Sequence, residues 1–438
     1  MSEKAKARTL AGFMELLPNE QVLFNQIEKN IKESYERFGF LPLDTPVIEA
    51  ADVLMAKIGG DTAKQIYSLT KGNTELALRF DLTVPLAKYI ALHQNELAFP
   101  FRRYQIGKVY RGERPQQGRF REFYQADIDI IGDGELNIMH DAEIPSVIYT
   151  TFREINVGDF TIKINNRKIL SGLFVSLGAS DKVTEILRII DKKDKIGDEA
   201  TREMLEELGL SLENINTVLE FISISGTTEE KLDILKNMKI DNELFRTGVT
   251  ELEQVVEGIR MFGVPDSNFK VDLTIARGLD YYTGTVYETT LDNYPQIGSV
   301  CGGGRYDNLS EFYSDKKMPG VGVSIGLTRL FYQLNKMELL SPTKKSISDA
   351  LVIPMVDDLE VCMQVATALR QQGINTEIFL ADKKTKAKFS YADKLKIPFA
   401  VIIGEDEVKA GKYSLKNLKT WEQKLLTLEE IIAEIKEV

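Results

Sequence analysis

The sequence predicts an α+β protein of three globular parts: a first domain built on an antiparallel sheet, a helical segment inserted into it, and a C-terminal α/β domain. Residues 101–133 alternate apolar and charged side chains around a turn-rich centre, which is typical of two antiparallel strands joined by a loop. Strand-like, glycine-rich segments return at 269–324, after a stretch of helical periods. From residue 350 onward, strand and helix patterns alternate. We therefore expect the first sheet to be completed by chain that follows the helical segment.

Two further elements precede the predicted hairpin. Residues 19–37 place apolar side chains at helical spacing and are followed by Gly39, so we expect an amphipathic helix that ends there. Residues 40–54 carry a strand pattern that is interrupted by Pro42 and Pro46. Proline within a strand favours an edge position, and an edge strand is a natural place for the seam of a dimer.

The changes of pattern along the chain give the expected domain boundaries. The segment rich in Leu, Ile, Glu and Lys shows no cluster of catalytic residue types, so we expect the chemistry to lie in the domain that it interrupts. We assign residues 1–158 and 264–335 to that core domain, 159–263 to the helical insertion, 336–347 to a polar linker and 348–438 to the C-terminal domain.

The composition is that of an ordinary soluble globular protein. The chain has 438 residues, of which 43% are hydrophobic and 28% are charged, enough for two or three cores. No apolar run approaches the roughly 20 residues that span a bilayer. The N-terminal residues lack an apolar core followed by a small-residue cleavage site. We therefore expect a cytoplasmic protein that has no membrane partner.

The few cysteines and histidines narrow the possible chemistry. Cys301 and Cys362 belong to no CxxC pair, and His93 and His140 have no partner at metal-ligand spacing. We therefore expect neither a disulfide framework nor a metal site made of protein side chains. The formal net charge is -11, but binding of nucleic acid needs only a local basic surface.

Basic residues are concentrated in the predicted hairpin. Guanidinium groups offer paired donors and stay charged, so such a density favours the binding of a polyphosphate. A solvated, charged ribbon is the alternative. The residues concerned are Arg102, Arg103, Lys108, Arg111, Arg114, Arg119 and Arg121.

Three polar residues near the end of the hairpin share one face of a strand, because strands have a period of two. They are Gln125, Asp127 and Asp129. An amide and two carboxylates beside an arginine-rich patch fit a cationic group next to an anionic one, as in an amino acid beside ATP. A polar sheet face in contact with water is the alternative.

Two later segments add candidate residues. Residues 276–288 contain Arg277 at a glycine-punctuated turn, and Tyr281 and Tyr282 follow an acid there. Two tyrosines beside an acid suit the wall of a pocket, although tyrosines are equally common at the edge of a core. Residues 320–330 read as a strand of small residues that runs into a helix, with Arg329 near the start of the helix. That position allows Arg329 to face a bound nucleotide.

The C-terminal domain contains a basic segment at residues 381–396. Phe389 and Tyr391 lie among its lysines and are possible stacking groups for RNA bases. A solvated, lysine-rich helix is the alternative. The lysines are Lys383, Lys384, Lys386, Lys388, Lys394 and Lys396.

Together these segments resemble the class II aminoacyl-tRNA synthetases, and within that class the histidyl-tRNA synthetase family, over nearly the whole chain. FLPLDTPVIE is similar to the first class motif, the hairpin around Arg111 to the second, and GVSIGLTRL to the third. RGLDYYTG and GGRYD resemble the histidine-specific signatures of the family. The resemblance implies a class II antiparallel-sheet catalytic core with a helical insertion, followed by a C-terminal α/β anticodon-binding domain.

The resemblance also implies the reaction. The carboxylate of histidine attacks the α-phosphate of ATP, and the histidyl group then passes to the terminal ribose of the tRNA. The nucleophile is already an anion, so alignment and charge stabilisation matter more than a general base. By resemblance, Arg111 holds the α-phosphate and the carboxylate, Arg277 is the second catalytic arginine, and Arg329 binds the distal phosphates. Arg119 and Arg121 are further ATP contacts, and Mg²⁺ bridges the phosphates.

Histidine and tRNA recognition follow from the same resemblance. A site that hydrogen-bonds both ring nitrogens rejects side chains that lack them. The positions that match the family's histidine site are Asp81, Thr83, Gln125, Asp129, Tyr281 and Tyr282. The candidates for tRNA contacts are Arg114, Gln116 and Gln117 at the acceptor stem and Lys383, Lys384, Lys386 and Lys388 in the anticodon-binding domain. We also expect a homodimer.

One position of the third motif departs from the family pattern, and another class of protein is the main competitor of this interpretation. Thr328 stands where many members have an acid, directly before Arg329. The competing class is a catalytically silent, synthetase-like regulatory subunit, such as the partner of ATP phosphoribosyltransferase in histidine biosynthesis. Such paralogues usually lack the C-terminal domain and the catalytic arginines, whereas this chain keeps both.

Overall fold

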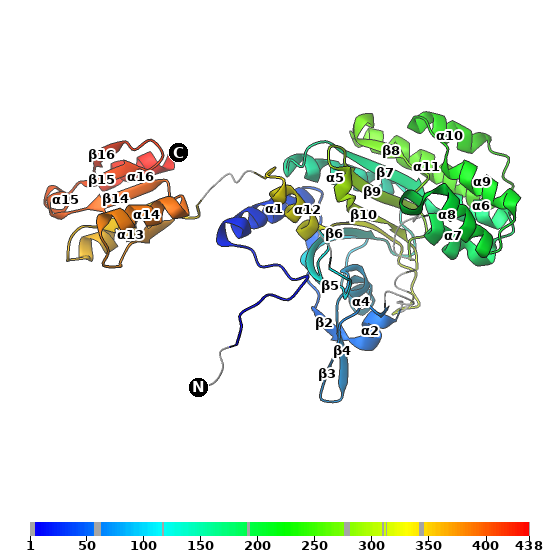
Figure 1. The fold of residues 1–438 in the computed structure, drawn as a ribbon, viewed down its shortest axis with the longest axis horizontal. Coiled ribbons are helices and arrows are strands. Elements are labelled where there is room, and N and C mark those ends of the chain that lie inside the picture. Colours follow the sequence, from blue (N-terminus) through cyan, green and yellow to red (C-terminus); the bar gives the residue numbers. More distant parts are fainter. Residues whose placement is uncertain are drawn as a thin grey trace. The chain divides into compact units, whose positions relative to one another are not determined.

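A computed structural model describes residues 5–56, 63–115, 118–190, 193–275, 281–308, 311, 313–340 and 346–437. The chain divides into two compact units (Figure 1). The larger unit contains residues 1–15 and 27–340, and the smaller unit contains residues 16–26 and 341–438. In the described part of the chain, no helix is both long and apolar enough to cross a membrane.

The larger unit is built on an eight-stranded sheet whose strands come from both sides of the helical segment. Its central strands are antiparallel, and only the two edge pairs, β1 with β5 and β7 with β8, are parallel. The order across the sheet is β1 (Leu41–Pro42), β5 (Phe101–Tyr110), β6 (Glu122–Ile131), β11 (Gly320–Ile325), β10 (Ser299–Tyr306), β9 (Thr285–Leu291), β7 (Phe160–Asn166) and β8 (Phe269–Val271).

This topology confirms the hairpin and the late completion of the sheet. β5 and β6 pair from Phe101 opposite Ile131 to Tyr110 opposite Glu122. β11 and β10, which follow the helical segment in sequence, lie between β6 and β9. The strand that contains Pro42 lies at the edge of the sheet, as expected for a strand that cannot donate at every position.

The helical segment differs from the expected insertion at its start. Residues 160–166 form β7, which pairs with β9 and β8 in the large sheet. Their alternation of buried apolar and partly exposed side chains fits a strand better than a helix. The helices that follow gather at one end of the sheet (Figure 1) and are α6 (Arg167–Ser176), α7 (Val183–Ile190), α8 (Lys193–Glu207), α9 (Leu212–Ile222), α10 (Thr228–Asn237) and α11 (Glu243–Met261).

One face of the sheet is covered by α5 (Met139–Glu154) and by the second half of α1 (Pro18–Arg37). The hydroxyl of Tyr35 in α1 donates to the carbonyl of Ala126 in β6 at 3.1 Å. From α5, the carboxylate of Asp141 accepts hydrogen bonds from the Arg305 guanidinium of β10. Arg305 therefore points to the face that α5 covers. Side chains alternate between the two faces along each strand, so Gln125 of β6 lies on the opposite face.

The opposite face is bordered by a small three-stranded sheet and by α4 (Thr83–His93). The small sheet has the order β2 (Ile48–Ala50), β4 (Thr74–Leu78) and β3 (Ser68–Lys71), and α2 (Ala51–Met55) packs on it. Leu86 and Ile90 of α4 pack in one cluster with Tyr281 and Tyr306. A last helix of this unit, α12 (Leu327–Lys336), directly follows β11.

The smaller unit contains a separate five-stranded sheet with helices. The strand order is β13 (Thr376–Ile378), β12 (Ala350–Pro354), β14 (Phe399–Ile403), β15 (Tyr413–Asn417) and β16 (Gln423–Leu426). β13, β12 and β14 are parallel, and β15 and β16 are antiparallel to their neighbours. The helices are α13 (Glu360–Gln371), α14 (Thr385–Leu395), α15 (Glu405–Ala410) and α16 (Leu428–Lys436). This alternation of strands and helices confirms the predicted α/β unit.

Candidate active site

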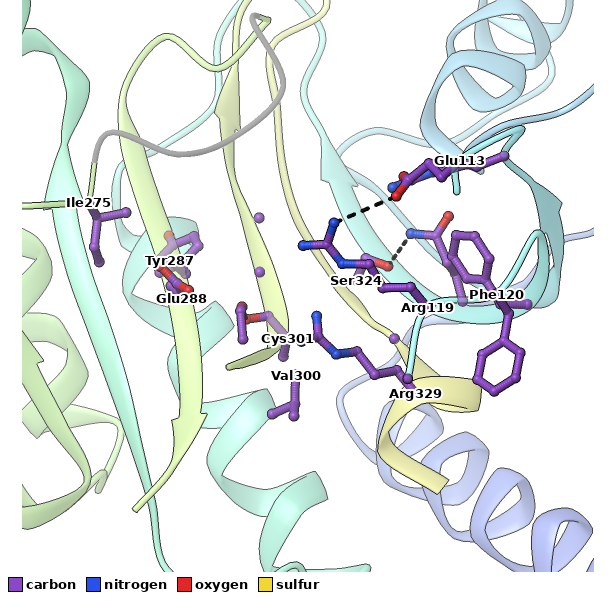
Figure 2. Close-up of a pocket in the computed structure, with 18 of the residues that line it drawn as sticks. Glu113, Arg119, Phe120, Ile275, Tyr287, Glu288, Val300, Cys301, Ser324 and Arg329 are labelled. Carbon is purple, nitrogen blue, oxygen red and sulfur yellow. Dashed lines mark hydrogen bonds and ion pairs between the residues drawn. The ribbon is translucent and has the colours of Figure 1, made fainter. Parts of the chain in front are cut away.

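A pocket of about 420 Å³ lies on the open face of the large sheet. Gln125 of β6, Ser324 of β11 and Glu288 of β9 line it, and so do glycines of β10. The hairpin loop between β5 and β6 and the first turn of α12 close one end (Figure 2). The volume falls in the range of small-molecule sites. The sheet completed by remote chain therefore carries a cavity of the right size for a substrate.

Three of the predicted ATP-binding arginines meet in this pocket. Arg111, Arg119 and Arg329 all line it, and Figure 2 shows Arg119 and Arg329 reaching into the same space. The pKa of Arg329 is lowered by burial and by the nearby charge of Arg119. No described residue pairs with the buried Nε of Arg329. Guanidinium groups that repel each other in a half-closed cavity form a site for an anion with several oxygens.

Two contacts hold Arg111 in place, one from the chain before α4 and one from the hairpin. Its Nε donates to the carbonyl of Phe80 at 3.0 Å, and its guanidinium lies 5.2 Å from the ring centre of Phe123. The carbonyl bond uses the Nε donor and leaves the other donors of the fork, and this side chain lines the pocket. Phe123, which the sequence did not single out, also lines the pocket and offers an apolar ring beside the arginine.

Arg121 is placed differently from the other three arginines. Its Nε donates to the carbonyl of Glu113 at 3.0 Å, and its backbone N–H donates to the carbonyl of Gly12 at 2.7 Å. It does not line the pocket. Arg121 therefore holds the base of the hairpin loop against the N-terminal segment. Arg114 is exposed and lies outside the pocket lining, and Gln116 and Gln117 lie outside the described residues.

Thr328, the departure from the family pattern, has a defined contact. Its side-chain hydroxyl accepts a hydrogen bond of 2.7 Å from the backbone N–H of Tyr124, and only 2% of the residue is exposed. The next residue, Arg329, donates through Nη2 to the carbonyl of Ile297. The first turn of α12 is therefore attached both to β6 and to the segment that precedes β10.

Buried acceptors lie beside the arginines. Gln125, Asp127 and Asp129 share one face of β6, as the strand period predicted, and all three are buried. Asp81 lies just before α4, where its Oδ1 accepts from the N–H of Val84 at 3.0 Å. No described residue donates a hydrogen bond to Asp81 Oδ2, Gln125 Oε1 or Asp127 Oδ1. Three unpaired buried acceptors form an environment that favours a cation.

Burial raises the pKa of these carboxyl groups. It brings the pKa of Asp81 to about 6 and that of Asp127 to about 7, although nearby arginines act in the opposite direction. Burial also raises the pKa of Asp129, against the effect of Arg103. A bound ammonium group would stabilise the charged forms and lower these pKa values. Asp81 and Asp127 therefore each keep a buried oxygen to which no described residue donates a hydrogen bond.

Arg103 is the buried partner of Asp129 and not a phosphate ligand. Its Nη2 lies 2.5 Å from Asp129 Oδ2, and the Arg103 side chain is fully buried. The hydroxyl of Tyr306 donates to the other oxygen, Asp129 Oδ1, at 2.7 Å. A Cβ at Gly322 of β11 would lie 2.2 Å from Asp129 Oδ1, so glycine is required where the two strands approach.

The other basic residues of the hairpin also divide by role. Arg102 pairs with Glu143 of α5 at 2.7 Å, and Lys108 pairs with Glu122 across the hairpin at 2.7 Å. The arginine-rich segment is thus neither wholly a phosphate site nor wholly a solvated ribbon. Only the partners, which the folded hairpin and α5 supply, separate the pocket arginines from the structural ones.

The two predicted tyrosines lie next to the acidic group. The ring centres of Tyr281 and Tyr282 are 4.9 Å apart, and Tyr281 hydrogen-bonds with Thr83. Tyr282 lines the pocket, and so does Ile275. Arg277 falls between them in residues 276–280, outside the described residues. The chain on both sides of that segment therefore meets the pocket.

The lysines predicted to contact tRNA lie in the smaller unit. Lys383, Lys384 and Lys386 are exposed at the start of α14, whereas the Nζ of Lys388 donates to the carbonyl of Pro354 at 2.6 Å. Of the two predicted stacking residues, Tyr391 donates to Glu377 at 2.8 Å and Phe389 is partly buried.

Comparisons with known proteins agree over the whole length. A family model described as Histidyl-tRNA synthetase matches residues 12–330, and one described as Anticodon binding domain matches residues 349–438. The histidine--tRNA ligase of Clostridium tetani (strain Massachusetts / E88) is 57% identical over 432 residues, which cover 98% of each chain.

Two solved structures extend the comparison. The histidyl-tRNA synthetase of Nostoc sp. PCC 7120 is 42% identical, with a TM-score of 0.89 over 99% of this chain and 100% of that one. A Bacillus halodurans protein titled as ATP phosphoribosyltransferase regulatory subunit/histidyl-tRNA synthetase has a TM-score of 0.74, with 22% identity over 89% of this chain and 97% of that one, and shares the fold. On the family model and the 57% identical relative, this chain belongs to the histidyl-tRNA synthetase family.

Proposed function

We propose that the protein is a histidine--tRNA ligase, which activates L-histidine with ATP and transfers it to tRNA(His). The observation that carries the proposal is the pocket in which three arginines face a cavity beside buried, unpaired acceptors. An anionic nucleotide and the ammonium group of an amino acid would then be bound side by side. Full-length relatives named histidine--tRNA ligase support the same conclusion.

In the first step, a carboxylate oxygen of histidine forms a bond to the α-phosphorus of ATP while the bond to the leaving pyrophosphate breaks. We assign Arg111 and Arg277 to the carboxylate and the α-phosphate, and Arg119 and Arg329 to the other phosphates. Arginine suits these roles because charge builds on phosphate oxygens and no proton must be removed. In the second step, a ribose hydroxyl of the tRNA attacks the histidyl carbonyl and AMP leaves.

We assign histidine binding to the acceptors around β6. The ammonium group would take Asp81 and Gln125, whose free oxygens are buried, with Thr83 and Tyr281 beside Asp81. The imidazole would lie near Tyr282 and Asp129. Arg103 and Tyr306 keep Asp129 as an oriented acceptor. A substrate that lacks the ring nitrogens would form fewer hydrogen bonds with these buried groups, which is the physical basis of discrimination.

Mg²⁺ is proposed as the companion of ATP. Among the described residues, no group of three or more His, Cys, Asp and Glu side chains could hold a metal ion. Glu288 nevertheless lines the pocket close enough to influence Arg329. One carboxylate fits an ion that is held mainly by phosphates and water, as Mg²⁺ usually is. Such an ion would neutralise charge on the phosphates.

We assign tRNA binding to two regions, in line with the anticodon-binding model that matches the smaller unit. Arg114, Gln116 and Gln117 of the hairpin loop would meet the acceptor stem, and Lys383, Lys384, Lys386 and Lys388 would meet the anticodon arm. We propose 336–347 as the linker, and we move the proposed start of the insertion from 159 to 167, because β7 is a strand of the large sheet.

We further propose that the protein acts in the cytoplasm as a homodimer. β1 lies at the edge of the large sheet, and Leu41 in it is 58% exposed. Exposed apolar side chains on an unpaired edge favour association with a second copy. Light scattering on the purified protein tests the oligomeric state, and a monomer at micromolar concentration would contradict it.

The experiment that tests the proposed function is histidine-dependent exchange of labelled pyrophosphate into ATP. We expect exchange with histidine and none with other amino acids, followed by charging of tRNA(His). A folded protein without exchange above background would contradict an enzyme and favour the regulatory-subunit class. That class is not favoured here, because the chain keeps the arginines and a C-terminal unit that matches the anticodon-binding model.

A further inference from the structure

The smaller unit carries a second pocket, of about 700 Å³, that no role assigned above uses. It lies at the amino ends of the parallel strands, where Asp349 precedes β12 and Pro398 precedes β14. The turn between β15 and β16 forms one wall, and Trp421 in that turn lines the pocket. The predicted lysines Lys383 and Lys384 precede α14 near the carboxyl end of β12. The two surfaces therefore lie at opposite ends of the parallel strands.

Trp421 is held in an exposed position by a strained but well-bonded turn. Its φ is +65°, a left-handed value that side chains rarely adopt, and the residue is 64% exposed. The backbone N–H of Trp421 donates to the carbonyl of Asn417 at 2.8 Å, and the N–H of Asn417 donates to the carbonyl of Glu422 at 2.9 Å. Strain that surrounding contacts maintain is common at binding sites.

A lysine fixes the orientation of the ring. The Nζ of Lys416 lies 5.0 Å from the ring centre of Trp421 and 5.3 Å from that of Phe389. Both aromatic residues line the pocket. A cation near both rings attracts each of them and leaves the rest of the exposed indole surface available. The result is an exposed aromatic surface with a positive charge beside it.

The surroundings of this aromatic surface suit an RNA base and its phosphates. Lys396, Lys419 and Lys436 line the pocket together with the apolar side chains of Phe389 and Leu418. Aromatic faces accept any base by stacking, and lysines attract the backbone. Asp349 and Asp393 also line the pocket, and Lys396 pairs with Asp393 at 3.1 Å, so the attraction for phosphate rests mainly on Lys419 and Lys436.

We propose that Trp421 is the stacking platform for an unpaired base of the tRNA anticodon loop. This inference rests on the proposed function, because it assumes that the smaller unit binds tRNA. In this proposal the RNA base contacts the surface at the amino ends of the parallel strands, where Trp421 lies. The lysines before α14 then attract the phosphates from a different side and contact no base.

The first test uses the fluorescence of Trp421, which is the only tryptophan in the chain. Addition of an RNA hairpin that carries only the anticodon stem and loop is expected to quench the emission of the full-length protein. The same RNA annealed to a complementary strand is the control, since its loop bases are paired. Equal quenching by both RNAs, or no change with the hairpin, would overturn the proposal.

The second test uses variants at this position. Glycine accepts positive φ without strain, so Trp421→Gly removes the ring while the turn is retained. We expect the KM for tRNA in aminoacylation to rise about tenfold or more, in line with the loss of one stacked base. Trp421→Phe keeps a ring and should raise the KM less. Leu425→Ala, which removes another exposed apolar side chain of this hairpin, is the matched control.

Pyrophosphate exchange by the same variants separates the possible outcomes, because that reaction needs no tRNA. A rise in the KM for tRNA that is confined to the Trp421 variants supports the platform. A KM within twofold of the wild type for Trp421→Gly, or an equal rise for Leu425→Ala, overturns it. If the wild type shows no exchange, the proposed function fails, whereas the fluorescence titration still decides on RNA binding.

Discussion

The hydroxyl of Thr328 accepts a hydrogen bond from the backbone N–H of Tyr124, and this bond joins the first turn of α12 to the start of β6. Arg329 follows directly in the helix, and Gln125 follows directly in the strand. The bond therefore fixes the distance between an arginine of the anion site and an acceptor of the predicted histidine site. A carboxylate would also accept this bond, so the threonine supplies the one property that this contact requires.

Replacement of Thr328 tests this contact. Thr328→Val keeps the shape of the side chain but removes the acceptor. The N–H of Tyr124 then loses its partner, which costs about 1–3 kcal/mol of unfolding free energy. We also expect a higher KM for ATP in pyrophosphate exchange, because Arg329 loses its fixed position. Thr328→Ser keeps an acceptor and is the control. Equal behaviour of the two variants in urea unfolding and in exchange would contradict the role.

Arg277→Ala should reduce pyrophosphate exchange far more than it weakens histidine binding. Loss of a group that acts mainly on the transition state lowers kcat, whereas loss of a group that only binds the substrate weakens the ground state and the transition state equally. Exchange kinetics and calorimetric titration with histidine measure the two effects. Arg277→Lys keeps the charge but not the fork, and should recover only part of the rate. Equal losses in both measurements would show that Arg277 serves binding alone.

Arg103→Met should destabilise the protein by about 3–5 kcal/mol, because it leaves Asp129 buried without its partner. Urea unfolding measures the loss. Arg102→Met is the matched control on the same strand, since its ion pair with Glu143 is partly exposed and should matter less. The double variant Arg103→Met with Asp129→Asn should lose less unfolding free energy than Arg103→Met alone. A double variant that is no more stable than Arg103→Met would contradict the assigned pairing.

The raised pKa values of the acidic group predict how stability depends on pH. The pKa of Asp127 is about 7 in the native protein against 3.8 as its ordinary value, and that of Asp81 is about 6. The native state therefore holds protons that the unfolded chain releases near pH 4. These two groups should make the free energy of unfolding fall as the pH rises from about 4 to about 7. Asp127→Asn should flatten the profile in that window, and an unchanged slope in urea unfolding would contradict the assignment.

Local pattern predicted much of the fold and part of the site. The two-residue period placed Gln125 and Asp129 on one face, and both the hairpin and the alternation in the smaller unit were confirmed. Pattern could not separate Arg103 from Arg119, because a buried arginine and a pocket arginine look alike until their partners are known. Trp421 was missed for a similar reason, since only the turn geometry exposes it.

The order of strands in the large sheet has a consequence for synthesis of the protein. β6 is flanked by β5 and β11, and β11 ends at residue 325, after the helical segment. At ~5–20 residues per second, the ribosome needs roughly 10–40 s to deliver β11 after β6 has emerged. During that interval one edge of β6 is an open template for other strands. The nascent chain is therefore most exposed to aggregation while its insertion is being made, and chaperone demand should peak there.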